Sequence, residues 1–239
     1  MSLPRARLIV SPLPAAGEKA RLSGEETAHA RARRLRRGDP VTLLDGSGRV
    51  ARAVLTRLDS GGAEVAVEEI IEARKEEFRI ELLVAGLRAE RLAWIAEKAA
   101  ELGVAELRIV ETARTQSFRG TSKVLERLAR VGREAAKQSE SDRWPRCSGP
   151  VSFAGVLAEE NPHRLILDPS GAPFPSKLPP GPVRVLVGPE GGWTSEELAS
   201  AASRGWTAAS LPAGKLRAET AAIAAVVLAR AALARGRRD

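Results

Sequence analysis

The sequence predicts two domains: a small N-terminal β-barrel over residues 1–71 and a C-terminal α/β domain over residues 78–239, with a mostly parallel sheet. Three observations lead to this fold class. In the first 70 residues, short apolar runs are separated by Gly-rich turns, which is typical of a small barrel. From Phe78 onward, strand patterns alternate with helix patterns, as in an α/β layer. Between these two parts, the charged run at 72–77 predicts a linker.

In the N-terminal domain, each predicted strand is a short apolar run bounded by turn residues. Residues 46–51 superficially resemble a dinucleotide-binding fingerprint, but they lie between strands with no helix behind them. We therefore interpret Gly46 and Gly48 as parts of a hairpin turn. The predicted strands are residues 8–10, 41–44, 50–55 and 63–67, and the turns are residues 38–40, 45–48 and 60–62.

The C-terminal domain begins with a strand, because apolar and charged residues alternate from Phe78 to Val84. The next helix is predicted to end at Gly103, since glycine tolerates the left-handed conformation that follows many helices. Thr194 and Glu197 form a capping box that starts another helix. The remaining apolar patterns predict strands at 107–110, 165–167, 183–187 and 208–211, and helices through Leu92, Ile95, Ala99 and Leu102, through Val124, Leu128, Val131 and Ala135, and over 219–234.

Composition excludes several classes of protein. With 44% hydrophobic and 28% charged residues, the chain can bury a core and is not expected to be disordered. Its apolar stretches are short, and its N-terminus lacks an apolar segment of signal-peptide length, so we expect neither a membrane nor a secreted protein. The single cysteine, Cys147, excludes an internal disulfide, fits a cytoplasmic location and is interpreted as an inert thiol. His29 and His163 lie 134 positions apart, which disfavours a histidine metal site or a Ser-His hydrolase.

The charge favours a nucleic-acid partner. The chain has 38 basic and 30 acidic residues, and only seven of the basic ones are lysines. Arginine grips phosphate with a planar fork and stacks on bases. A GC-rich genome would explain the Arg-to-Lys ratio equally well, but it does not explain the net charge of +8. Residues 29–37 hold five arginines, and we expect this run to contact RNA or DNA; a solvated face is the alternative.

Two loops predict a ligand cradle at the carboxyl end of the sheet. Residues 188–192 hold three glycines and one proline between a strand and the capped helix, and residues 211–217 join another strand to the last helix. Glycines let the backbone approach a ligand closely. Because no lysine follows the first glycines, this loop is not a nucleotide-triphosphate loop. A tight turn without a ligand is the alternative, and Arg217 and Glu219 could be ordinary first-turn residues.

Three motifs together resemble the RsmE family of bacterial 16S ribosomal RNA uridine-N3 methyltransferases, which belong to the SPOUT class. They are Gly-Pro-Glu-Gly-Gly at 188–192, Leu-Arg-Ala-Glu-Thr-Ala at 216–221 and Glu-Lys-Ala-Ala-Glu-Leu-Gly-Val at 97–104, in family order. The resemblance covers nearly the whole chain. It implies a PUA-like RNA-binding barrel, an α/β SPOUT domain with a deep trefoil knot, bound S-adenosylmethionine and a homodimer acting on 16S ribosomal RNA or the small ribosomal subunit.

The resemblance and the loop pattern together predict the site residues. Arg217 is expected to stabilise a developing uridinate, and Glu190 or Glu219 to act as general base. The homodimer is expected to use Ile223, Val226, Val227 and Ala231 of the last helix, unless the chain's own sheet covers them. The cofactor is expected at Leu167, Gly188, Pro189, Glu190, Gly191, Gly192, Leu211, Pro212, Gly214 and Leu216, and the RNA at Arg5, Arg31, Arg33, Arg36, Arg114 and Arg143.

The chain departs from the family pattern in several places. Lys137, Glu140 and Ser141 replace the first, fourth and fifth residues of a usual Glu-Gln-Ser-Gly-Arg, and Pro212 and Gly214 stand in a segment that usually reads Leu-Gly-x-Arg-Ile. Cofactor binding through backbone atoms should tolerate these changes, whereas the uridine pocket is more sensitive to them. Two alternatives are a SPOUT enzyme that methylates another atom, such as a ribose 2′-hydroxyl, and a non-catalytic RNA-binding protein of ribosome assembly.

Overall fold

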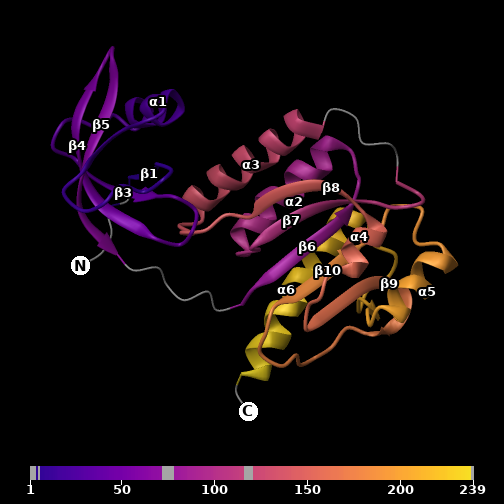
Figure 1. The fold of residues 1–239 in the computed structure, drawn as a ribbon. Helices are drawn as coiled ribbons and strands as arrows, with labels where there is room; N and C mark the ends of the chain where they lie inside the picture. The colour runs from indigo at the N-terminus through magenta and orange to yellow at the C-terminus, as the bar shows by residue number, and fades with distance from the viewer. Residues whose placement is uncertain (1–3, 5, 72–77, 116–120, 238–239) are drawn as a thin grey trace. The chain divides into compact units, whose positions relative to one another are not determined.

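The computed structural model describes residues 4, 6–71, 78–115 and 121–237 (Figure 1). Arg5 and the predicted linker 72–77 lie outside the described residues. The chain forms two compact units, the first comprising residues 1–76 and 137–143, and the second residues 77–136 and 144–239. The first unit therefore includes a segment that the sequence assigned to the C-terminal domain, because residues 137–143 pack against the N-terminal part of the chain.

The described residues of the first unit form a five-stranded sheet in the order β1-β3-β4-β5-β2. β1 runs parallel to β3, and the other neighbours are antiparallel. The predicted strands all appear, and the Gly46–Gly48 segment is the hairpin turn between β3 and β4, with both glycines at positive φ. The bounds are β1 Arg7–Ile9, β2 Lys19–Arg21, β3 Pro40–Leu44, β4 Val50–Asp59 and β5 Gly62–Ile71.

Alternate residues of these strands bury one apolar core, with Leu8, Leu43, Leu55 and Val65 fully covered. The helix α1 (Gly24–Ala32) adds Ala30 to this core and was not predicted. Its N-cap, Ser23, accepts a hydrogen bond from the backbone N–H of Glu26. The basic run 29–37 thus begins in the last turn of a helix and continues into the turn before β3.

Residues 137–143 are joined to the rest of the first unit by ion pairs between largely buried side chains. The Lys137 ammonium lies 2.8 Å from a Glu26 carboxylate oxygen, and both side chains are 5% exposed. The other Glu26 oxygen accepts a hydrogen bond of 3.1 Å from the Ile9 N–H. Arg7 donates to the Asp142 carboxylate over 2.6 Å and to the Ser141 carbonyl over 2.8 Å. This segment is therefore an integral part of the first unit.

The second unit contains a sheet of six parallel strands in the order β11-β9-β10-β6-β7-β8. The central strand β10 (Val183–Val187) is buried along its whole length, as expected for a parallel strand covered on both faces. The other strands are β6 Ile80–Ala85, β7 Glu106–Glu111, β8 Arg146–Ser152, β9 His163–Pro173 and β11 Thr207–Ser210.

Two separate cores lie on the two faces of this sheet. The larger one packs the helices α2 (Ala89–Glu101), α3 (Thr121–Gln138) and α6 (Ala218–Gly236) against residues such as Leu82 and Val185. The smaller one packs α4 (Phe153–Ala158) and α5 (Ser195–Ser203) against Leu83 and Leu186. Gly103 after α2 has φ +66°, and the capping box at Thr194 and Glu197 is present, so both predicted helix boundaries are confirmed. β8 and α4 were not predicted.

Candidate active site

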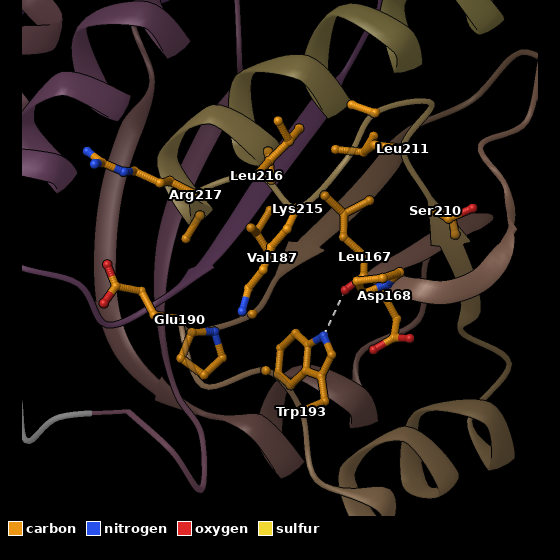
Figure 2. Close-up of a pocket in the computed structure, with 18 of the residues that line it drawn as sticks. Leu167, Asp168, Val187, Glu190, Trp193, Ser210, Leu211, Lys215, Leu216 and Arg217 are labelled. Atoms are coloured by element: carbon orange, nitrogen blue, oxygen red, sulfur yellow. Dashed lines mark hydrogen bonds between the residues drawn. The ribbon is translucent and has the colours of Figure 1, made fainter.

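A cavity of about 930 Å³ opens where three parallel strands end (Figure 2). Val187 is the last residue of β10 and Ser210 the last of β11, and Leu167 follows the part of β9 that pairs with β10. Residues 167–169 within β9 and the loops that follow β10 and β11 line the cavity. The volume is in the range of small-molecule sites, which lie at this edge of open α/β sheets.

The cavity gathers most of the predicted cofactor residues. Leu167, Gly188, Pro189, Glu190, Gly192, Leu211, Gly214 and Leu216 line it, whereas Gly191 and Pro212 do not. The role of Gly191 in the cradle stays a prediction; a Cβ at this position would lie 3.4 Å from the Arg114 side chain. Asp168 and Lys215, which lie in the predicted loop segments, also line the cavity, and so do Trp193 and Ser210, which were not predicted from the sequence.

Trp193 forms the floor between two of the loops. Its indole N–H donates a hydrogen bond of 2.9 Å to the Leu167 carbonyl, shown as the dashed line in Figure 2. The ring also packs on Phe153, with centroids 5.5 Å apart. A Cβ at Gly188 would approach the indole to 2.8 Å, so this position requires glycine unless the ring moves. Gly188 thus allows the backbone of its loop to lie close to the Trp193 indole.

Asp168 and Lys215 supply opposite charges to the lining. The Asp168 carboxylate is fixed by the backbone N–H of Ser170 over 2.8 Å and by the Ser170 hydroxyl. Figure 2 shows Asp168 and Ser210 on one side of the cavity, with Arg217 and Glu190 on the other. The cavity therefore has an apolar interior, with a fixed carboxylate on one side and one cationic and one anionic side chain, Arg217 and Glu190, on the other.

The two predicted base candidates share one partner that sequence reasoning missed. Arg91 of α2 forms an ion pair with Glu190, and its Nε lies 3.6 Å from a Glu219 carboxylate oxygen. Glu190 is exposed, whereas the other Glu219 oxygen is buried and has no hydrogen-bond partner among the described residues. Arg217 is the N-cap residue of α6, and its side chain makes no capping hydrogen bond. It is exposed and lines the cavity.

The predicted RNA-binding arginines are distributed over both units. Arg31, Arg33 and Arg36 are exposed in the first unit, and the Arg31 guanidinium donates to the Asp59 carbonyl. Arg143 belongs to the same unit and donates to the Ser47 carbonyl. Arg114 belongs to the second unit, where it donates to the Gly191 and Trp193 carbonyls. Arg5 lies outside the described residues.

The other candidate groups take no part in the cavity. Burial raises the pKa of the Cys147 thiol to about 12, which fits the interpretation of an inert thiol. One His163 ring nitrogen lies 2.9 Å from the Pro179 carbonyl. In the described part of the chain, His, Cys, Asp and Glu side chains form no group of three or more that could hold a metal ion. None of the helices described there is long and apolar enough to cross a membrane.

Comparison with known proteins supports this reading of the two units. The family model of an RNA methyltransferase domain matches residues 74–230, and that of an RNA methyltransferase PUA domain matches residues 22–68. The ribosomal RNA small subunit methyltransferase E of Mycobacterium bovis is 31% identical over 237 residues, which cover 91% of this chain and 88% of the relative. The protein of the same name from Synechocystis is 32% identical over 198 residues, and the chain spans 64% of its length.

Two solved structures with bound cofactor have the same fold. The ribosomal RNA small subunit methyltransferase E of Neisseria gonorrhoeae, bound to S-adenosyl methionine, matches with a TM-score of 0.85 at 26% identity, over 95% of this chain and 98% of that one. A Legionella pneumophila protein in complex with SAM matches with a TM-score of 0.86 at 27% identity, over 96% and 98% of the two chains. The chain therefore belongs to the RsmE family, whose members carry the name ribosomal RNA small subunit methyltransferase E.

Proposed function

We propose that this protein methylates N3 of a uridine in 16S ribosomal RNA of the small subunit, using S-adenosylmethionine bound in the cavity at the strand ends. The observation that carries the proposal is the position of the RsmE motifs: residues 188–192 and 216–218 both contribute to the lining of one cavity. The similar structures with bound cofactor, and the names of the relatives, support the choice of cofactor and substrate.

The residues present fit this cofactor. Leu167, Leu211 and Leu216 would give an apolar surface for an adenine ring, and Asp168 would complement the positive sulfonium and amino groups. Lys215 would complement the carboxylate of the methionine part. A Cβ at Gly214 would meet no atom within 4 Å, so the lining leaves open space at that point. When bound, S-adenosylmethionine supplies a methyl group activated by the positive charge on sulfur.

The chain's own residues would manage the charge and the proton of the uridine. N3 of uridine carries a proton at neutral pH, and its loss leaves negative charge on O2 and O4. Arg217 would stabilise this charge from its exposed position at the cavity. Both base candidates stay open: Glu219 has a buried carboxylate oxygen without a partner among the described residues but does not line the cavity, whereas Glu190 lines it and is exposed.

Analysis of RNA nucleosides by mass spectrometry tests the proposed function. A strain that lacks the gene should lose N3-methyluridine from its 16S RNA, and the restored gene should return it. Loss of a 2′-O-methylated nucleoside instead would identify a different methylated atom. Unchanged nucleosides, together with no binding of labelled cofactor, would leave a non-catalytic RNA-binding protein.

The same proposal includes a cytoplasmic location, a trefoil knot in the second unit and a homodimer. A crystal structure traced through residues 165–217 checks the knot. For the dimer, Val226 is no longer a candidate interface residue because it is fully buried in its own core, whereas Val227 on the same helix is 48% exposed. Trp94 of α2 is 41% exposed, and α2 packs against α6. These side chains support an interface on the exposed part of this helix pair.

Light scattering at micromolar concentration tests the dimer. A homodimer has twice the mass of the 25.5 kDa chain, and Val227→Arg should reduce the mass to that of one chain because it places a charge in an apolar interface. A wild-type protein with the mass of one chain would contradict the dimer.

A further inference from the structure

Arg114 contacts the Gly-rich loop with both parts of its side chain. Its Nη1 donates hydrogen bonds to the Gly191 carbonyl over 2.7 Å and to the Trp193 carbonyl over 3.2 Å. A Cβ built on Gly191 would lie 3.4 Å from the Arg114 Cδ and 3.6 Å from its Cβ, so the alkyl stem lies against this glycine. One side chain thus covers Gly191 and bonds the carbonyls on either side of Gly192.

The neighbouring residue makes a second connection to the same segment. The backbone N–H of Ala113 donates over 2.8 Å to one oxygen of Glu197, whose other oxygen accepts from the Thr194 N–H over 2.9 Å. Glu197 is buried, and hydrogen bonds to a carboxylate are among the stronger ones in proteins. Residues 113–114 are therefore joined to residues 191–197 by three hydrogen bonds.

These bonds fix the part of the loop that meets the cavity. Gly192 lines the cavity and has φ +70°, which most other residues adopt only with strain. Trp193, the next residue, forms the cavity floor through its bond to Leu167. Because the carbonyls before and after Gly192 both point to Arg114, the orientation of the intervening peptides depends on that guanidinium.

We infer that Arg114 is a positioning residue for the cofactor loop rather than the RNA-binding residue that the family resemblance implied. The inference rests on the proposed function, in which this loop binds S-adenosylmethionine. Arg114 acts on the cofactor through the Gly191 and Trp193 carbonyls. Its removal weakens cofactor binding, whereas the number of phosphates that the protein neutralises stays the same.

Three measurements on Arg114→Ala separate these roles. Calorimetry should show a cofactor Kd about tenfold higher, because the variant lacks the charged donor that holds the loop. The KM for the cofactor should rise likewise, while kcat at saturating cofactor stays within about twofold. RNA binding should keep its salt dependence, since neutralising one phosphate fewer would lower the slope by about 0.7 to 0.9. Arg114→Lys, which retains N–H donors, should recover part of the cofactor affinity.

Arg204→Ala is the matched control, because it removes the same charge from an exposed residue at the end of α5. It should change neither the cofactor Kd nor the KM. Glu197→Gln provides a second route to the same connection, since it replaces one carboxylate acceptor by a donor and should also raise the cofactor Kd. Thermal unfolding verifies that each variant is folded.

The results distinguish failure of this inference from failure of the proposed function. If the wild-type protein does not bind S-adenosylmethionine, the proposed function is wrong and this inference falls with it. If the wild-type protein binds the cofactor, and Arg114→Ala binds it with the same Kd, the positioning role alone is overturned. A lower salt slope with unchanged cofactor affinity would also overturn it and would assign Arg114 to the RNA.

Discussion

Gly188 and Gly191 stand three positions apart in one loop but have different neighbours. A Cβ at Gly188 would come within 2.8 Å of the Trp193 indole, whereas one at Gly191 would meet the Arg114 stem at 3.4 Å, an ordinary van der Waals distance. Gly188→Ala should therefore displace the indole from Leu167 and raise the cofactor Kd at least about tenfold, or 1.4 kcal/mol. Gly191→Ala should change it by less than about threefold. Calorimetry on the two variants checks this, and equal effects would contradict the assigned floor.

Cys147 gives a prediction about reactivity and pH. Burial raises its pKa from 9.0 to about 12, so the folded thiol keeps its proton where an unfolded one has lost it. Alkylation by iodoacetamide at pH 8 should be far slower in the native protein than in denaturant. Because the unfolded state loses this proton first, the thiol makes the free energy of unfolding fall as pH rises from about 9 to 12. Cys147→Ala should remove that part of the pH dependence, and rapid native labelling would contradict the burial.

Among single residues, the sequence could identify the glycines that line the cavity better than the side-chain partners around them. Gly188, Gly192 and Gly214 were predictable because a glycine between a strand and a helix has a stereochemical reason to be there. Arg91 and Arg114 were not, since nothing local separates them from the other arginines of this Arg-rich chain. Their roles depend on residues about 80 to 130 positions away, which only the fold brings near them.

At the scale of elements, predictions held where periodicity or capping was strong. The capping box at Thr194 and the apolar spacing of α2 both correspond to observed helices. α1 was missed because its polar sequence has no apolar stripe, although Ser23 and Glu26 carry a capping pattern. β8 was missed because Gly149 and Pro150 interrupt it, and such residues usually argue against a strand.

The end of α3 gives a prediction about stability. Lys137 and Glu26 are each 5% exposed, so removing one partner leaves an uncompensated buried charge. Lys137→Met alone should destabilise the first unit by about 3 to 5 kcal/mol, a range measured for broken buried pairs. The double variant Lys137→Met, Glu26→Leu should be less destabilised than the sum of its single variants. Chemical denaturation followed by a signal from the first unit measures these differences.

The matched control for this pair is Arg52→Met, because Arg52 pairs with Glu69 where the glutamate is 58% exposed. An exposed pair contributes at most about 1 kcal/mol, so this variant should stay close to the wild type. If Lys137→Met were equally mild, the pair would not hold residues 137–143 in the first unit. The Lys137 charge, a departure from the family pattern, would then have no structural role.

At the scale of the whole molecule, the two domains were predictable from composition and periodicity, but their exact membership was not. The change from turn-bounded strands to alternating strands and helices marks the boundary near residues 72–77. Residues 137–143 belong to the first unit because Lys137, Ser141 and Asp142 bond to residues of its N-terminal part. Such long-range contacts produce no recognisable pattern in the local sequence. The exposed arginines of residues 31–37 belong to the first unit, and the residues that line the cavity belong to the second.

This separation predicts that RNA affinity and cofactor affinity can be altered independently. Arg33 and Arg36 are exposed in the first unit, and all the residues that line the cavity belong to the second. Arg33→Ala with Arg36→Ala should weaken RNA binding and lower its salt slope by about 0.7 to 0.9 for each phosphate that is no longer neutralised. Cofactor affinity should stay within about twofold, since no lining residue changes.

Arg217→Ala should have the opposite effects. RNA affinity should be nearly unchanged, while kcat falls, because the proposed interaction with the uridinate forms mainly in the transition state. Filter binding over a range of salt concentrations, calorimetry with the cofactor and methylation rates distinguish the two variants. If the double arginine variant methylates RNA with an unchanged KM and an unchanged salt slope, residues 31–37 are only a solvated surface. The RNA would then have to be bound through other basic residues, and Arg143, which donates to the Ser47 carbonyl of the hairpin turn, would be the first to test.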